Sequence, residues 1–310
     1  QTALGYYAGY NNTGSYQTAL GYKAGRSNIG SSQTALGYEA GYSNTGGFQT
    51  ALGYYAGYSN TGFYQTALGY YAGYYNTGAF QTALGYEAGR SNAVDYQTAL
   101  GYKAGRSNIG SSQTALGYRA GSSNTGGFQT ALGCSAGDYN TGNYQTALGY
   151  NAGYYNARDS QTALGYKAGY SNTGSAQTAL GYKAGYENAG DRVIGIGYEA
   201  TTNASALADD VVAIGYQAGK GNTVANQFIV QQANINTVPL IQGDFASGNV
   251  GIGTISPAQK LHVAGYARAD SGFCIGTSCI TAWPQGEVTG TGTTNYVPLW
   301  TTSSNIGDSA

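Results

Sequence analysis

Residues 17–32 read QTALGYKAGRSNIGSS, and residues 33–48 read QTALGYEAGYSNTGGF. The same 16-residue phrase, with the pattern QTALGYxAGxxNTGxx, runs twelve times over residues 1–192 without an insertion or a deletion. A unit of this length is too short to bury a core of its own, so consecutive copies must stack on one another. The sequence therefore predicts a solenoid, an architecture suited to holding things apart or presenting a surface.

Eight of the sixteen repeat positions are identical in all copies, and they indicate a strand followed by tight turns. Thr, Leu and Tyr at positions 2, 4 and 6 alternate with Gln, Ala and Gly at positions 1, 3 and 5, so each set occupies one face of a strand. Gly at positions 9 and 14, the second preceded by Asn-Thr, is typical of corners with positive φ. We predict an all-β protein, a β-solenoid whose coils each hold one well-defined strand, a turn, a shorter strand and a second turn.

Each repeat offers one Leu, one Tyr and two Ala, which is little apolar surface to offset the ordering of 16 residues. This shortfall favours additional burial between chains, and a face of Gln, Ala and Gly would let neighbouring solenoids approach closely. We therefore expect an oligomer. The sequence leaves open which face meets the partner chain, although we expect the invariant Leu column, including Leu100, to be core.

The composition excludes several classes of partner. The chain has 52 Gly and 32 Tyr but only 13 Lys and Arg against 14 Asp and Glu, a formal net charge of −1. Without a basic run we expect neither nucleic acid nor anionic lipid as a partner. No stretch is apolar for long enough to insert into a membrane.

The chain has no initiator Met and starts and stops within recognisable phrases, so we expect it to be a piece of a longer protein.

The ALGYxAG phrase resembles the head repeats of trimeric autotransporter adhesins. The divergent copies VIGIGYEA at Val193–Ala200 and VVAIGYQAG at Val211–Gly219 carry the likeness further, with a longer loop at 205–210. In that family the repeats form a left-handed parallel β-roll, and three chains associate into a trimer that binds host surfaces. The resemblance covers roughly residues 1–225 and implies a homotrimer; the family's repeats are usually a residue or two shorter.

The segment TVPLIQGDFASGNVGIGTISPAQKLHV at Thr237–Val263 is similar to modules of trimeric tail-fibre-like proteins, many of which end in an endosialidase-type intramolecular chaperone. The closing stretch TTNYVPLWTTSSNIGDSA at Thr293–Ala310 resembles the opening of another such module. These likenesses imply short β-hairpin or β-prism fibre modules. We accordingly divide the chain into twelve solenoid repeats (1–192), divergent capping coils (193–225), a tail-fibre-like β module (226–272), and a Cys hairpin with the start of a further module (273–310).

Nothing in the sequence favours an enzyme. The single His, His262, lies in an alternating KLHV pattern with no partner at ligand spacing, so we interpret it as a strand residue. Gly248, Gly251 and Gly253 superficially suggest a phosphate loop, but no helical pattern follows and we interpret them as turn glycines. Asp209 and Asp210 are expected in a solvated loop. We predict no catalytic, cofactor-binding or metal-binding residue.

The cysteines indicate a compartment. Cys274 and Cys279 flank a four-residue turn, so a hairpin would place them opposite each other at a separation suited to a disulfide. That pairing favours an oxidising, extracellular setting, although two free cysteines remain the alternative. Cys134 replaces the Tyr of the ninth repeat and lies too far along the solenoid to reach the other two.

Function should lie in the variable positions, because the fixed ones are committed to folding. Positions 7 and 10 accept Lys, Arg, Glu and Tyr and are therefore expected to be exposed. Their tyrosines would form amphipathic strips suited to recognition and to stacking on sugar rings, or would simply stabilise neighbouring coils. The residues predicted to bind a surface are Tyr42, Tyr58, Tyr74, Arg90, Arg106, Tyr154 and Tyr170.

These features predict a structural and adhesive extracellular fibre, on a bacterial cell surface or a phage virion, that presents its tyrosines to glycans or host-cell receptors. Two other classes stay open. A glycan-degrading phage tail spike would require paired carboxylates in a groove. An ice-binding solenoid would require a flat Thr-x-Thr face, whereas here Thr is followed two residues on by Leu.

Overall fold

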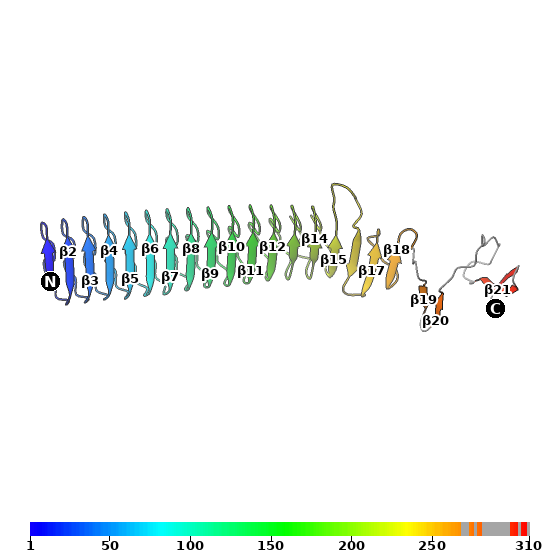
Figure 1. The fold of residues 1–310 in the computed structure, drawn as a ribbon, viewed down its shortest axis with the longest axis horizontal. Helices are drawn as coiled ribbons and strands as arrows, with labels where there is room; N and C mark the ends of the chain where they lie inside the picture. Colours follow the sequence, from blue (N-terminus) through cyan, green and yellow to red (C-terminus); the bar gives the residue numbers. More distant parts are fainter. Residues whose placement is uncertain (268–272, 276–277, 281–297, 303–304, 309–310) are drawn as a thin grey trace. The chain divides into compact units, whose positions relative to one another are not determined.

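The computed structural model describes residues 1–267, 273–275, 278–280, 298–302 and 305–308. The chain divides into two compact units, residues 1–264 and residues 265–310. The first unit is a parallel β-solenoid of 16-residue coils whose strands lie side by side in one row (Figure 1).

Each of the twelve repeats contributes one short strand, always from its first residues. The strands are β1 (Thr2–Leu4), β2 (Gln17–Leu20), β3 (Gln33–Leu36), β4 (Gln49–Leu52), β5 (Gln65–Leu68), β6 (Gln81–Leu84), β7 (Gln97–Leu100), β8 (Gln113–Leu116), β9 (Gln129–Leu132), β10 (Gln145–Leu148), β11 (Gln161–Leu164) and β12 (Gln177–Leu180). Neighbouring strands pair in parallel, and every residue faces its equivalent sixteen positions later, as Ala99 faces Ala115. Each repeat position therefore becomes a straight column along the solenoid.

The interior of the coil holds the small and amide side chains, not the leucines. In β7, Gln97 and Ala99 are 2 % and 1 % exposed, whereas Leu100 is 37 % exposed. The expectation that the Leu column is core is therefore wrong, and the Gln and Ala face does not look outward. The reason is the narrow cross-section of the coil: a Cβ added to Gly41 would lie only 3.0 Å from the Cβ of Ala35.

Hydrogen bonds along the solenoid axis pair one atom of most buried amides, whereas the other atom, such as Nδ2 of Asn44 or Oε1 of Gln33, has no partner among the residues that the structure describes. The Oδ1 atom of each buried Asn accepts a bond from the backbone N–H of the next, as between Asn28 and Asn44 at 2.8 Å. The Nε2 atom of most buried Gln residues donates to a carbonyl at position 14, as from Gln33 to Gly46 at 2.8 Å, and Gln97 is an exception. These ladders hold the interior together where apolar surface is scarce.

The return segment of each coil does not form the second, shorter strand that we expected. It turns instead through left-handed residues at positions 7, 11 and 16, where Tyr55, Ser59 and Tyr64 have φ of 54°, 53° and 57°. Position 9 has the expected positive φ, 59° at Gly57. Position 14 does not: a Cβ on Gly62 would collide with the carbonyl oxygen of Gly78 in the next coil, which favours glycine there, although Val94 and Arg158 occupy this position in two other coils.

The solenoid continues beyond the regular repeats. Strands β13 (Ile194–Ile196), β14 (Val212–Ile214) and β15 (Gln227–Val230) extend the parallel sheet. The sheet then reverses, since β16 (Ile241–Asp244) and β17 (Asn249–Ile252) pair antiparallel, and β18 (Leu261–Val263) pairs parallel with β17. Gly251 is thus a strand residue and not a turn glycine, and a Cβ on it would meet the Thr254 carbonyl oxygen at 2.7 Å.

The described residues of the second unit form two antiparallel strand pairs. Strands β19 (Phe273–Ile275) and β20 (Ser278–Ile280) pair antiparallel, and so do β21 (Pro298–Thr302) and β22 (Asn305–Asp308). The backbone register places Cys274 opposite Cys279, as the sequence predicts. Parts of the predicted 226–272 and 273–310 modules, namely 268–272, 276–277, 281–297, 303–304 and 309–310, lie outside the described residues.

Candidate binding surface

The seven residues predicted to bind a surface belong to one column, repeat position 10. Stacking of the coils in register brings them into line, with Ser122 and Asp138 filling the two coils between Arg106 and Tyr154. All seven are half-buried, so the expectation of free exposure holds only in part. Some of these side chains also lie against position 7, as Tyr58 does against Tyr55 with ring centres 5.3 Å apart and Tyr74 against Tyr71 at 4.9 Å.

The tyrosines of this column form a continuous stack over three coils. The rings of Tyr42 and Tyr58 lie 5.0 Å apart at 5°, and those of Tyr58 and Tyr74 lie 5.1 Å apart at 22°. Burial raises the pKa of Tyr58, and burial with a hydrogen bond to Tyr75 raises that of Tyr74. These phenols therefore remain neutral at physiological pH.

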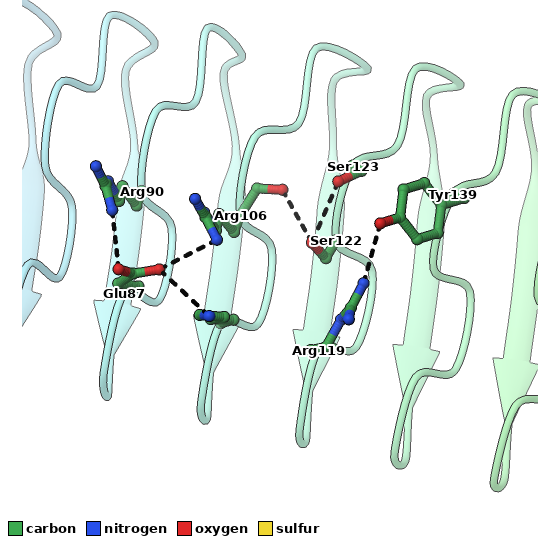
Figure 2. Close-up of polar contacts among 8 residues, drawn as sticks. Glu87, Arg90, Arg106, Arg119, Ser122, Ser123 and Tyr139 are labelled. Atoms are coloured by element: carbon green, nitrogen blue, oxygen red, sulfur yellow. Dashed lines mark hydrogen bonds and ion pairs between the residues drawn. The ribbon is translucent and has the colours of Figure 1, made fainter.

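Charged side chains replace the tyrosines in the sixth and seventh coils, and Glu87 lies among them. Its carboxylate accepts a hydrogen bond from Arg90 at 2.8 Å and lies 3.2 Å from Nη1 of Arg106 (Figure 2). Nζ of Lys103 is 4.0 Å away. One buried carboxylate therefore contacts three cations drawn from two coils.

A second acidic residue, Asp138, is fully buried in the ninth coil. Its Oδ2 atom lies 3.1 Å from Nη2 of Arg119, and the same nitrogen donates to the Tyr139 hydroxyl at 3.1 Å. Burial raises the pKa of Asp138 to about 6, although the Arg119 guanidinium opposes the shift. Burial thus outweighs the ion pair at this site.

Sequence reasoning missed Glu87, Lys103, Arg119, Ser122 and Asp138 as members of a site. A signal for them was present. Opposite charges 16 residues apart share a column, as Glu87 and Lys103 do, and charges 19 residues apart join position 7 to position 10 of the next coil, as Arg119 and Asp138 do. Only a solenoid of known register turns these long separations into contacts.

Two further aromatic columns lie on the surface. At position 6 the rings stack coil after coil, with Tyr70 and Tyr86 5.0 Å apart, until Cys134 interrupts the series with a half-buried free thiol. At position 16, four exposed rings stack 4.9 to 5.0 Å apart: Phe48, Tyr64, Phe80 and Tyr96. The leucines share the outward face of the strands with position 6.

The other residues considered from the sequence, His262, Asp209 and Asp210, lie in the strand and the loop that the sequence predicts. His262 lies in β18, as predicted, and its Nδ1 accepts a bond from the Ala258 backbone N–H at 3.4 Å. Asp209 and Asp210 lie in a loop, as predicted, where Asp210 pairs with Arg192. No group of three or more His, Cys, Asp or Glu in the described part of the chain could hold a metal ion. Over the same residues no helix is long and apolar enough to span a membrane.

No protein-family model, no curated protein and no solved structure matches the chain. The class that the structure defines is therefore architectural: a parallel β-solenoid of about 14 coils with 16-residue repeats.

Proposed function

We propose that this chain is part of an extracellular, homotrimeric fibre that presents a repetitive surface for adhesion. Its repeats resemble the left-handed β-rolls of trimeric autotransporter adhesin heads, and its later segments resemble tail-fibre modules. The proposal involves no catalytic step. The fibre belongs to a bacterial surface or a phage virion, settings in which such repeats would project a binding surface away from its anchor.

One observation carries the trimer: the outward leucines. Leu84, Leu100 and Leu116 are 42 %, 37 % and 39 % exposed and stand in one column on a continuous parallel sheet. A contiguous apolar stripe of this length is unusual on the surface of a monomer and typical of an interface. Its burial against two further copies would supply the apolar contact that a coil filled with Ala, Gln and Asn lacks.

The solution mass tests the assembly. We expect light scattering to give three times the 31.9 kDa of one chain. Replacing Leu84 and Leu100 by Asp places two charges in the proposed interface and should yield single chains with an unchanged β spectrum. The matched control carries Asp at Thr61 and Thr77, two exposed residues of a column outside the strand face, and should remain trimeric. A wild-type mass of one chain would contradict the proposal.

Attachment assays test the adhesive role. Replacing Tyr42, Tyr58 and Tyr74 by Ser removes the stacked rings of position 10 while leaving the strand face intact. The triple variant should stay folded and trimeric but attach less to glycan-coated and cell surfaces. Equal attachment by the variant and the wild type would show that the position-10 tyrosines do not take part in binding.

A second function competes for the same face. Thr66 and Thr82 are exposed on the strands at coil spacing, an arrangement that favours ordered water and so ice binding. The two uses exclude each other, because a face buried in a trimer cannot touch ice. Thermal hysteresis in a single-chain preparation would establish ice binding in place of the fibre.

A further inference from the structure

We propose that coils six to nine form a binding site for an oxyanion carried on an acidic glycan, such as a sulfate ester on a sugar chain. The inference deepens the adhesive role proposed above and rests on it for the glycan. It begins with an interruption in the position-10 column. Between the stacks that end at Tyr74 and resume at Tyr154, the column reads Arg90, Arg106, Ser122 and Asp138.

The interruption concentrates positive charge. Four cations take part in the local ion pairs, namely Arg90, Lys103, Arg106 and Arg119, against the two carboxylates of Glu87 and Asp138. Asp95 is a third carboxylate of these four coils, so their formal charge is +1 in a chain whose formal net charge is −1. An excess of cations at one place favours an anion there, and the arrangement of these cations decides how well it is bound.

A hollow lies at the centre of this charge. It has a volume of about 320 Å³, and Lys103, Arg106 and Arg119 line it together with the hydroxyls of Ser122, Ser123 and Tyr139. These lining groups all carry N–H or O–H groups, although the Ser122 hydroxyl already donates to the Arg106 carbonyl oxygen. Neither Glu87 nor Asp138 lines the hollow. A wall of donors without a carboxylate suits an oxyanion, because charge-assisted hydrogen bonds to anions are strong.

Ser122 opens the hollow. Most coils carry Tyr or Arg at position 10, but Ser122 is small and 4 % exposed, and its hydroxyl donates to the Arg106 carbonyl oxygen at 3.3 Å. A buried serine therefore forms the floor where a ring would otherwise stand. The volume lies in the range of small-molecule sites, about 300 to 1,000 Å³, and so exceeds the need of a single sulfate group.

Aromatic rings on both sides favour a sugar as the carrier of the anion. The Arg90 guanidinium lies 5.3 Å from the ring centre of Tyr71 and 5.4 Å from that of Tyr74. Beyond the hollow, Tyr139 stacks on Tyr155 at 5.0 Å. Amphipathic rings next to fixed cations suit an acidic sugar chain, whereas a nucleic acid would require a longer basic track.

The chain contains its own matched control. Residues 17–32 and 97–112 have the same sequence, so Lys23 and Lys103 each lie within an identical repeat. Lys23 lies 3.2 Å from Glu39, in a coil whose next position-10 residue is Tyr42 and not a serine. Lys23→Gln and Lys103→Gln thus remove the same charge from the same local sequence, once outside and once inside the proposed site.

Calorimetric titration of the full chain with a sulfated oligosaccharide tests the site. We expect Lys103→Gln to weaken binding about tenfold and Lys23→Gln to leave it unchanged. Ser122→Tyr fills the hollow with the ring that other coils carry there, keeps every charge, and should weaken binding by a similar factor. Circular dichroism should be used to check that each variant is folded. If loss of Lys103 disturbs the ion pairs of Glu87, Ser122→Tyr still tests the site because it changes no charge.

Five outcomes would overturn the inference. Equal losses in Lys23→Gln and Lys103→Gln would assign binding to net charge and not to the hollow. Equal affinity for the desulfated oligosaccharide would show that the site does not recognise the sulfate group. Equal affinity for single-stranded DNA would show that it does not distinguish a glycan from another polyanion. Binding of inorganic sulfate without the oligosaccharide would leave an ion site only. If the fibre attaches to neutral glycans and Lys103→Gln does not change that attachment, this inference is wrong, whereas the adhesive role is still supported.

Discussion

The side-chain Oδ1 atom of Asn44 accepts a hydrogen bond of 2.8 Å from the backbone N–H of Asn60, sixteen residues further along the chain. The same bond recurs between Asn60 and Asn76, so each asparagine both supports the next coil and is supported by the previous one. The Asn column is therefore a second ladder of hydrogen bonds, parallel to the one between the strands. It lies in the interior, where these side chains are 0 to 1 % exposed.

Replacing Asn60 by Ala should destabilise the solenoid by about 1 to 3 kcal/mol, because the Asn76 N–H loses its buried acceptor. Chemical denaturation followed by circular dichroism measures the change. Thr61→Ala is the control, since its side chain is exposed on the same turn and should have almost no effect. Equal stabilities for the two variants would mean that the ladder contributes nothing.

Replacing Ala99 by Asp should cost several kcal/mol, since the new carboxylate would be buried without a partner in a coil that has no room for it. Leu100→Asp places the same charge one residue further on, on the outward face, and should leave the coil formed. Far-UV circular dichroism distinguishes the two. Loss of structure in Leu100→Asp alone would show that the leucines are the core after all.

Ser59 has a left-handed backbone conformation, with φ of 53°, which a side chain disfavours. Ser59→Gly relieves that strain and should raise the free energy of unfolding by up to about 1 kcal/mol, even though glycine also gains freedom in the unfolded chain. Thr66→Gly, within strand β5, should lower it by about 0.5 to 1 kcal/mol. Thermal melts of the two variants should therefore shift in opposite directions.

The pH dependence of the free energy of unfolding should reveal the protonation of Asp138. Its pKa is raised by burial to about 6 from an ordinary value of 3.8, so the folded protein binds a proton that the unfolded chain releases between these values. The stabilisation is complete below pH 4 and is lost as the pH rises through 6, a change of roughly 2 to 3 kcal/mol. Arg119 faces this carboxylate and keeps its positive charge over that range.

The difference between the wild type and Asp138→Asn isolates this effect from other titrations. Denaturation curves at pH 4 and pH 7 should show the wild type losing stability relative to the variant at the higher pH. A constant difference across that range would mean that the carboxylate titrates at its ordinary pKa.

Cys274 and Cys279 occupy opposite positions of the β19–β20 hairpin, and we predict that they form a disulfide. Closing so small a loop should stabilise the hairpin by about 2 kcal/mol. Mass spectrometry after alkylation without reductant should find both thiols protected, and reduction should expose them. Alkylation of both cysteines in native, unreduced protein would count against the bond.

The sequence predicted the coil length, the strand at its start and the columns, because these follow from period and alternation alone. It did not predict which face of QTAL lies inside. Alternation separates Ala99 from Leu100 but is symmetric between the two faces, and the choice depends on the width of the closed coil. The charged site was missed for a similar reason, since Arg119 and Asp138 become neighbours only when the coils stack in register.

Pairing of every residue with the one sixteen positions later makes the coils interchangeable modules. Excision of residues 49–64 would leave Gln33–Leu36 facing Gln65–Leu68, a strand of the same sequence as the one removed. Duplication of a repeat is equally compatible with the sheet. The reach of such a fibre can therefore change during evolution in increments of one coil, about 4.8 Å, while any site built from adjacent coils is carried along unchanged.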